Sequence, residues 1–108
     1  MSTQSEKVNI LKNAVDTRDL KELVYRCLPE QGAVEVQNDV PGKEHAWHVH
    51  DTDETLIILE GSVRFYWTDN EAVCTSGDVI VLPRHARHGS VALEDGAKYI
   101  IAFNHISI

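Results

Sequence analysis

The amino-acid sequence predicts an all-β fold, an antiparallel sandwich or barrel. From residue 44 onward, short apolar or alternating runs recur between separators that carry Gly, Pro, Asn or Asp, the pattern of short strands joined by turns. Alternation within one run places Val63, Phe65 and Trp67 on a single apolar face, as expected for a strand with one buried side. The runs cover residues 44–50, 55–60, 62–67, 72–75, 79–82, 89–94 and 98–104.

The first 39 residues are expected to form an N-terminal segment that packs on a barrel made by residues 40–108. Residues 7–11 and 33–40 have the composition of strands, and Pro41 with Gly42 turns the chain into the first strand of the barrel. At 108 residues, with 43% hydrophobic residues, the chain has the length of one domain with a single core.

Residues 17–28 are predicted to form a short helix. Their apolar side chains recur at i, i+3, i+4, i+7 and i+8, which is the stripe of an amphipathic helix. Asp16 or Thr17 can cap the N-terminus, and Pro29 ends the helix. An edge strand over residues 23–28 is the alternative interpretation.

Turn residues divide the barrel region into separate strands. Residues 51–53 are Asp-Thr-Asp, Gly61 follows the next run, and Gly96 lies within the last separator. We therefore expect the chain to reverse at each of these positions.

Charge and composition exclude several classes of partner. The net charge is -7 and the isoelectric point is about 5.2, which disfavours binding to nucleic acid or to an anionic membrane surface. The polar N-terminus lacks a secretory signal, and no apolar run approaches the roughly 20 residues of a membrane span, so a cytoplasmic location is expected. Cys27 and Cys74 match no metal or redox spacing and are expected to be reduced thiols.

Three histidines and one glutamate form a candidate metal site that is divided between two parts of the sequence. His48 and His50 are two residues apart, so on one strand both imidazoles point to the same face. Glu54 follows the polar turn at 51–53, so these three ligands are expected to come from one hairpin. His88 lies beyond a second strand and has to be brought in by the fold. The alternative is that His48 and His50 are two exposed histidines on a strand edge that bind no metal ion.

This donor set suits a divalent first-row transition metal ion, namely Fe, Mn, Ni, Co, Cu or Zn, because imidazole and carboxylate donors are of intermediate hardness. Four protein ligands leave two positions of an octahedral ion free, whereas a structural zinc site is closed. We therefore expect one metal ion per chain and chemistry at that ion. If Glu54 points inward, Leu56 and Ile58 on the same strand do so too.

The spacing around these ligands resembles the first sequence motif of the cupin superfamily. The matching pattern is Gly42-x5-His48-x-His50-x3-Glu54-x6-Gly61, and every fixed position of the motif is met. The resemblance covers about residues 40–104, and it is specific because a second motif follows in the right order and at the right separation.

The second cupin motif is met in part. Gly77, Pro83 and His88 stand in register, whereas His85 takes the place of a glycine and Ala92 the place of an asparagine. A glycine at the position of His85 allows a left-handed turn, which histidine adopts at some cost, so the shape of this loop is open.

The resemblance implies a small antiparallel jelly-roll barrel with the metal ion inside, held by His48, His50, Glu54 and His88. It also implies a homodimer that binds a small molecule. It does not select a reaction, because members of the superfamily include dioxygenases, decarboxylases, isomerases, lyases and proteins that only bind a ligand.

His85 and Arg87 are candidate residues at the rim of the site, because they lie in the loop that delivers His88, and loops on a rigid barrel commonly carry function. An arginine there, Arg84 or Arg87, could bind a substrate carboxylate. The alternative is that both arginines are solvated charges.

Other polar and aromatic residues near the motif are expected to lie outside the site. His45 has the opposite strand parity to His48 and should point away. Trp47 is expected on the outer face or at a subunit contact, and His105 in an exposed tail. Asp51 and Asp53 are expected to form the turn rather than to bind the metal.

The sequence therefore favours a mononuclear metal enzyme of dioxygenase or oxidoreductase type that acts on a small molecule. A metal-containing binding or sensing module without turnover is the main alternative, followed by an isomerase, lyase or decarboxylase.

Overall fold

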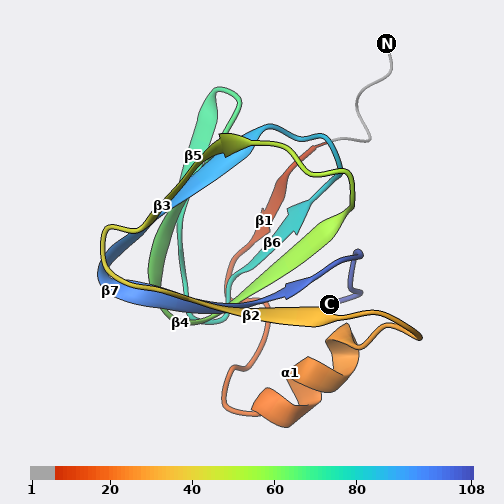
Figure 1. Cartoon of the computed structure of the whole chain (residues 1–108). Helices are drawn as coiled ribbons and strands as arrows, with labels where there is room; N and C mark the ends of the chain where they lie inside the picture. Colours follow the sequence, from red (N-terminus) through yellow and green to blue (C-terminus); the bar gives the residue numbers. More distant parts are fainter. Residues whose placement is uncertain (1–6) are drawn as a thin grey trace.

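The computed structural model describes residues 7–108, and it confirms the mostly β architecture (Figure 1). Residues 1–6 of the predicted N-terminal segment lie outside the described residues. All paired strands run antiparallel. The elements of the described chain are β1 (Asn9–Leu11), α1 (Leu20–Cys27), β2 (Val34–Asp39), β3 (Glu44–His48), β4 (Glu54–Trp67), β5 (Asn70–Thr75), β6 (Val79–Leu82) and β7 (His88–Ala102).

The two long strands β4 and β7 form the centre of the sheet and pair with each other along most of their lengths. The strand order is β1-β6-β4-β7-β2, with β3 added on β7 and β5 added on β4. Figure 1 shows the sheet curling round on itself, so that β2 and β3 accompany different parts of β7. This arrangement is consistent with the predicted jelly-roll barrel.

The expected chain reversals at Gly61 and Gly96 are wrong. The predicted runs 55–60 and 62–67 are one continuous strand, β4. The runs 89–94 and 98–104 both belong to β7, except that residues 103 and 104 lie beyond the end of this strand. Both glycines have positive φ, +79° and +70°, and Gly61 lies opposite Ala97 where the register shifts. An irregularity of this kind bends a strand without reversing it, so β4 and β7 contribute to both walls of the barrel.

Substitution of Gly61 is therefore expected to destabilise the protein more than substitution of other glycines at positive φ. A Cβ atom at Gly61 would overlap the backbone carbonyl of Gly96, whereas one at Gly42, also at positive φ, would meet nothing within 4 Å. Gly42→Ala should cost only the left-handed backbone strain, about 1–2 kcal/mol of unfolding free energy. Gly61→Ala should cost about 1–3 kcal/mol more because the backbone must move. Urea unfolding of the two variants checks this difference, and equal losses would contradict the proposed close approach.

The helix is confirmed, but its predicted cap is wrong. Helix α1 begins at Leu20 with Asp19 as N-cap, whose carboxylate accepts a hydrogen bond from the Glu22 N–H at 3.1 Å. Asp16 instead accepts bonds from the backbone and side chain of Arg18, which hold a turn before the helix. The edge-strand alternative for residues 23–28 is excluded by the helix.

Two apolar clusters stabilise the fold. One fills the barrel interior, and the other lies between the sheet and the buried face of α1, which is formed by Leu23 and Cys27. Both cysteines are free thiols, as expected, and both are buried. Burial raises the pKa of the Cys74 thiol to about 11. Within residues 7–108, no helix has the length and apolar character needed to cross a membrane.

Candidate metal centre

Strand β7 brings His88 beside the histidines of β3. In the antiparallel register His48 lies opposite His88, and on its other side His88 lies opposite Trp67 of β4. The expectation that His48, His50 and Glu54 share one hairpin is wrong, because β3 pairs with β7 and not with β4. The turn at residues 51–53 therefore connects two strands that lie on either side of the N-terminal part of β7.

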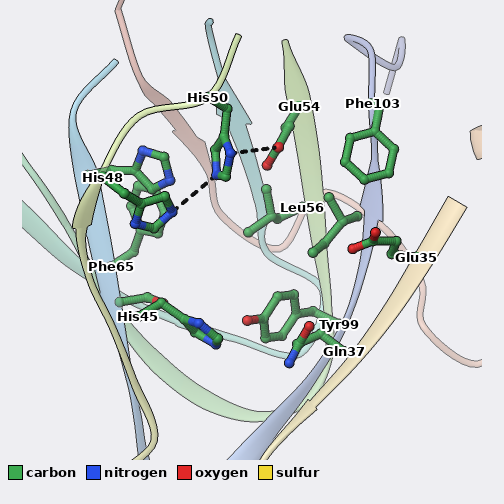
Figure 2. A pocket seen from close by; sticks show the side chains of 13 residues that line it. Glu35, Gln37, His45, His48, His50, Glu54, Leu56, Phe65, Tyr99 and Phe103 are labelled. Atoms are coloured by element: carbon green, nitrogen blue, oxygen red, sulfur yellow. Dashed lines mark hydrogen bonds and ion pairs between the residues drawn. The ribbon is translucent and has the colours of Figure 1, made fainter. Parts of the chain in front are cut away.

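The three histidines converge closely enough to hold one ion. One ring nitrogen from each of His48, His50 and His88 lies within 4.8 Å of the others, and the Nε2 atoms of His48 and His50 are 3.1 Å apart (Figure 2). Two nitrogens bound at about 2.1 Å to a single ion, at angles of about 90–109°, are separated by about 3.0–3.4 Å. The observed spacing therefore fits adjacent ligands of a metal ion.

Backbone carbonyls orient two of these imidazoles. Nδ1 of His88 lies 2.8 Å from the carbonyl oxygen of Ala86, and Nδ1 of His48 contacts the carbonyl oxygen of Ala46. A carbonyl oxygen only accepts, so each Nδ1 carries the proton and donates it. The lone pair of each ring is then on Nε2, which is the arrangement that second-sphere carbonyls give to metal-binding histidines.

Glu54 lies beside the cluster rather than within it. The residue is 5% exposed, and its Oε2 atom is 3.7 Å from Nδ1 of His50, which is longer than a hydrogen bond. Figure 2 shows His50 between His48 and Glu54, so the carboxylate faces the side of the ring opposite to His48. The structure thus brings together three of the four predicted ligands and leaves the fourth adjacent to them.

Burial lowers the pKa of two of the clustered histidines, His50 and His88, and raises the pKa of the neighbouring Glu54. Burial lowers the pKa of His88 to about 4, and the neighbouring His48 and His50 act in the same direction. The pKa of His50 is lowered by burial and then by His48. Burial raises the pKa of Glu54 to about 7, and the negative charge of Glu35 adds to this effect.

Metal binding is therefore expected to displace a proton from Glu54. With the pKa of this carboxyl at about 7, the proton is mostly present at pH 6 and mostly absent at pH 8. Calorimetric titration of the metal-free protein with Zn²⁺, in buffers of different ionisation enthalpy, should show fewer protons released as the pH rises over this range. The Glu54→Gln variant should lack this dependence. A release that is independent of pH, or unchanged in the variant, would contradict the assignment.

The histidines open into a cavity of about 350 Å³ inside the barrel. Its apolar lining residues are Leu56, Phe65, Ile101 and Phe103, with the Phe65 ring stacked on His88 at 5.5 Å between centroids. The inward orientation predicted for Leu56 is thus observed. Among the described residues, the lining contains carboxylates but neither lysine nor arginine.

His45 also lines this cavity, so the prediction that it points away is wrong. His45 pairs with Ser90 and His48 with His88, which places three residue steps of β3 against two of β7. This β-bulge changes the strand parity, and both histidines face inward. Nε2 of His45 lies 3.0 Å from a carboxylate oxygen of Asp39.

Polar residues that the sequence interpretation missed also line the cavity, beside Ile101 on the paired strands β2 and β7. Glu35 and Gln37 of β2 and Tyr99 of β7 line the cavity, with Phe103 nearby (Figure 2). A signal was present in residues 34–40, where Glu35, Gln37 and Asp39 alternate with apolar residues and Asn38. The polar side faces the cavity, while Val36 is 75% exposed, the reverse of an ordinary half-buried strand.

The predicted rim residues His85 and Arg87 lie along a different surface cavity, with Trp67 and Asn70. The guanidinium of Arg87 stacks over the ring of Trp47, 5.3 Å from its centroid, and Trp47 is on the outer face as expected. His85 adopts the left-handed conformation, with φ +68°, and its N–H donates to the carbonyl of His50. The loop therefore keeps a turn of the kind that a glycine allows.

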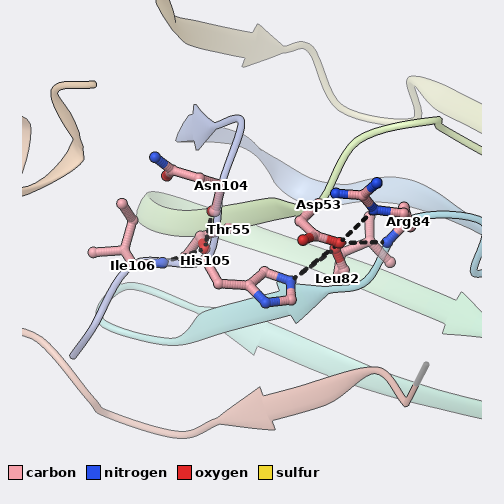
Figure 3. Close-up of polar contacts among 7 residues, drawn as sticks. All are labelled: Asp53, Thr55, Leu82, Arg84, Asn104, His105 and Ile106. Carbon is pink, nitrogen blue, oxygen red and sulfur yellow. Dashed lines mark hydrogen bonds and ion pairs between the residues drawn. The ribbon is translucent and has the colours of Figure 1, made fainter. Parts of the chain in front are cut away.

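Asp53, in the turn before β4, links this turn by a hydrogen bond to the loop before His88 (Figure 3). Its carboxylate accepts a hydrogen bond from the Arg84 N–H at 2.9 Å, and Nε2 of the exposed His105 lies 3.9 Å away. The adjacent Thr55 donates to the carbonyl of Asn104 at 2.7 Å, which holds the C-terminal tail against β4. Asp53 is thus a structural turn residue, as expected, while Asp51 is exposed.

Comparison with known proteins identifies the family and the fold. The model of the cupin domain family matches residues 35–103. A DUF861 family protein from Thermotoga maritima is 26% identical in sequence, with 90% of this chain and 99% of that chain covered and a TM-score of 0.61. A cupin-2 domain protein from Shewanella frigidimarina is 25% identical, with 93% and 96% covered and a TM-score of 0.57.

A cupin superfamily protein from Desulfitobacterium hafniense has the same fold at 14% identity, with 97% of this chain and 84% of that chain covered and a TM-score of 0.60. No curated protein sequence matches this chain significantly.

Proposed function

Since the chain belongs to the cupin domain family, we propose that it is a mononuclear metal enzyme that acts on a small molecule within its barrel. The observation that carries the proposal is the convergence of His48, His50 and His88, two of them with Nδ1 fixed by a carbonyl and the lone pair on Nε2. Glu54 would complete the ligand set once ionised. A bound divalent first-row ion would supply Lewis-acid or redox chemistry at this end of the cavity.

The protein's own residues would bind and shield the substrate. The apolar lining residues Leu56, Phe65 and Ile101 would exclude water from the reacting groups. Gln37 and Glu35 lie across the cavity from the histidines, where hydrogen bonds could orient the far end of a small molecule. We favour an oxygen-dependent reaction, because the ligand set leaves two positions of an octahedral ion free.

Oxygen uptake with candidate substrates tests this proposal. The protein loaded with Fe²⁺ or another first-row ion should turn over a member of a panel of small diketones, hydroxyketones and acids, and should consume oxygen in doing so. His88→Ala, which removes one ligand, is the matched inactive control. A molecule that binds tightly but is recovered unchanged, aerobically and anaerobically, would favour a binding module instead.

The substrate is proposed to be uncharged, because the cavity is lined by Glu35 and Glu54 without a lysine or arginine among the described lining residues. Arg87, the predicted carboxylate partner, lies elsewhere. Glu35→Gln is expected to tighten binding of glycolate to the Co²⁺-loaded protein about three- to tenfold by removing a like charge, and to leave glycolamide binding unchanged. Absorption titrations of the cobalt ion measure both. Equal effects on the two probes would contradict the proposed charge selection.

A homodimer is also proposed. Strand β2 lies at one end of the described sheet, its Val36 is exposed, and a second exposed residue, Val40, directly follows the strand. A second copy could cover this edge, as edge strands commonly require. Sedimentation of wild-type protein and of Val36→Lys distinguishes a dimer through this surface from a monomer.

A further inference from the structure

We propose that His45 is an acid–base catalytic residue of the cavity, held in place by the carboxylate of Asp39. The inference rests on the proposed function in one respect, because it assumes that the substrate occupies the cavity next to the three histidines. His45 is not a member of that histidine cluster. It reaches the cavity only because of the bulge in β3, and its side chain remains one-third exposed there (33%).

Hydrogen bonds hold the carboxylate of Asp39 in place as an acceptor. The residue is 3% exposed, and its carboxylate accepts hydrogen bonds from Tyr99 Oη at 2.7 Å and from Gln37 Nε2 at 2.9 Å, besides its contact with His45. Burial favours the neutral acid, but the bonds from Tyr99, Gln37 and His45 outweigh it and lower the pKa of Asp39. The carboxylate is therefore ionised at neutral pH.

An ionised carboxylate only accepts hydrogen bonds, so the proton of the neutral His45 ring is on Nε2. That nitrogen lies 3.0 and 3.1 Å from the two oxygens of Asp39. Nδ1 then carries the lone pair, and in the described part of the chain the polar contacts of this ring go to Asp39 alone. A ring held by a carboxylate at one nitrogen and free at the other has the arrangement of an oriented general base.

The proposed step is a proton transfer without a change of redox state. Nδ1 of His45 takes a proton from a carbon next to a substrate carbonyl, and the electron pair of the broken C–H bond forms an enolate. The negative charge of Asp39 stabilises the imidazolium that results. If the proton on Nδ1 is first replaced by one from water, its delivery to the same carbon gives exchange with solvent. In a hydroxyketone, delivery to the former carbonyl carbon, while the hydroxyl proton moves to the former carbonyl oxygen, gives an isomer. A neutral hydroxyketone has the required groups.

The tautomer of His45 can be tested without metal or turnover. Imidazole ¹⁵N–¹H correlation spectra of the metal-free protein should show His45 protonated at Nε2 and unprotonated at Nδ1. In Asp39→Asn, where an amide can donate to Nε2, the proton should move toward Nδ1, an effect that loss of packing alone would not produce. Protonation of Nδ1 in the wild-type protein would overturn the inference.

Proton transfer is tested with hydroxyacetone in D₂O, using protein loaded with Zn²⁺. Deuterium incorporation, followed by NMR, should be faster than with the same concentration of free Zn²⁺, and His45→Gln should lower the rate at least about a hundredfold. Glutamine can still donate to Asp39, so the variant should keep its melting temperature and its zinc content. Equal rates in the wild type and His45→Gln, or no exchange above free Zn²⁺ in a protein that holds zinc, would overturn the inference. Failure to hold zinc would instead count against the proposed metal site.

Discussion

The double variant His48→Ala/His50→Ala is expected to purify without a bound metal ion and to remain folded. The change removes two of the three clustered ring nitrogens, so affinity for a first-row ion should fall at least about a thousandfold, given the large binding free energies of such sites. The fold should survive because both residues are only partly buried, and they lie outside the two apolar clusters. Elemental analysis and calorimetric titration with Zn²⁺ measure the loss.

A matched control removes two imidazoles elsewhere. His85→Gly/His105→Ala takes away two exposed histidines, and glycine suits the left-handed backbone at position 85. This control should bind metal like the wild-type protein. Full metal occupancy in His48→Ala/His50→Ala would show that the ion is held by other residues.

Glu54→Gln is expected to weaken metal binding and yet to stabilise the metal-free protein at pH 8. The pKa of Glu54 is raised from 4.5 to about 7, so folding favours the protonated form. The contribution of Glu54 to the free energy of unfolding is fully present below pH 4.5 and is lost as the pH rises through about 7. At pH 8 the wild-type protein buries a charged carboxylate, and glutamine removes this cost, roughly 1–3 kcal/mol of unfolding free energy.

Urea unfolding of the chelator-treated proteins at pH 5 and pH 8 measures the effect. The gain should be present at pH 8 and close to zero at pH 5, where Glu54 is mostly protonated in the folded protein. Glu60→Gln, at an exposed position of the same strand, should show no such pH-dependent gain. A metal-free Glu54→Gln protein that is less stable at pH 8 would show that the ionised carboxylate is stabilised by a partner.

Several features of the fold follow from local pattern and were predicted from the sequence. The β runs, the inward face of Val63 and Phe65, and helix α1 depend on periodicity that each segment carries by itself. The position of the helix cap differed by a few residues because three neighbouring side chains, Asp16, Thr17 and Asp19, can each act as a cap, and only the hydrogen bond to Glu22 distinguishes them.

The errors arose where a single residue changes the path of a strand. A glycine can reverse the chain or bend a continuous strand, and what decides at Gly61 is the close approach of Gly96, which is 35 residues away in the sequence. Likewise, parity assigned His45 to the outer face because a bulge within β3 leaves no mark in the residue types. The strand pairing, not the local sequence, determines both outcomes.

The residues of the candidate site were likewise predicted only in part. Spacing identified the three histidines that the structure brings together, and it identified Glu54 as their neighbour. Tyr99, which lines the cavity, and its partner Asp39 could not be identified from spacing, because their hydrogen bond joins residues 60 positions apart on paired strands. The alternating polar residues of β2 were the available signal, but they can be assigned to the lining of the cavity only once the fold of the barrel is known.

Metal content is the most direct test of the central claim, that this barrel holds a single catalytic ion on His48, His50 and His88 with Glu54. The protein should be purified without chelators, passed through gel filtration and measured by elemental mass spectrometry. About one divalent first-row ion per chain is expected, either as purified or after incubation with Fe, Mn, Ni, Co, Cu or Zn. A protein that is folded at neutral pH but takes up none of these ions would contradict it.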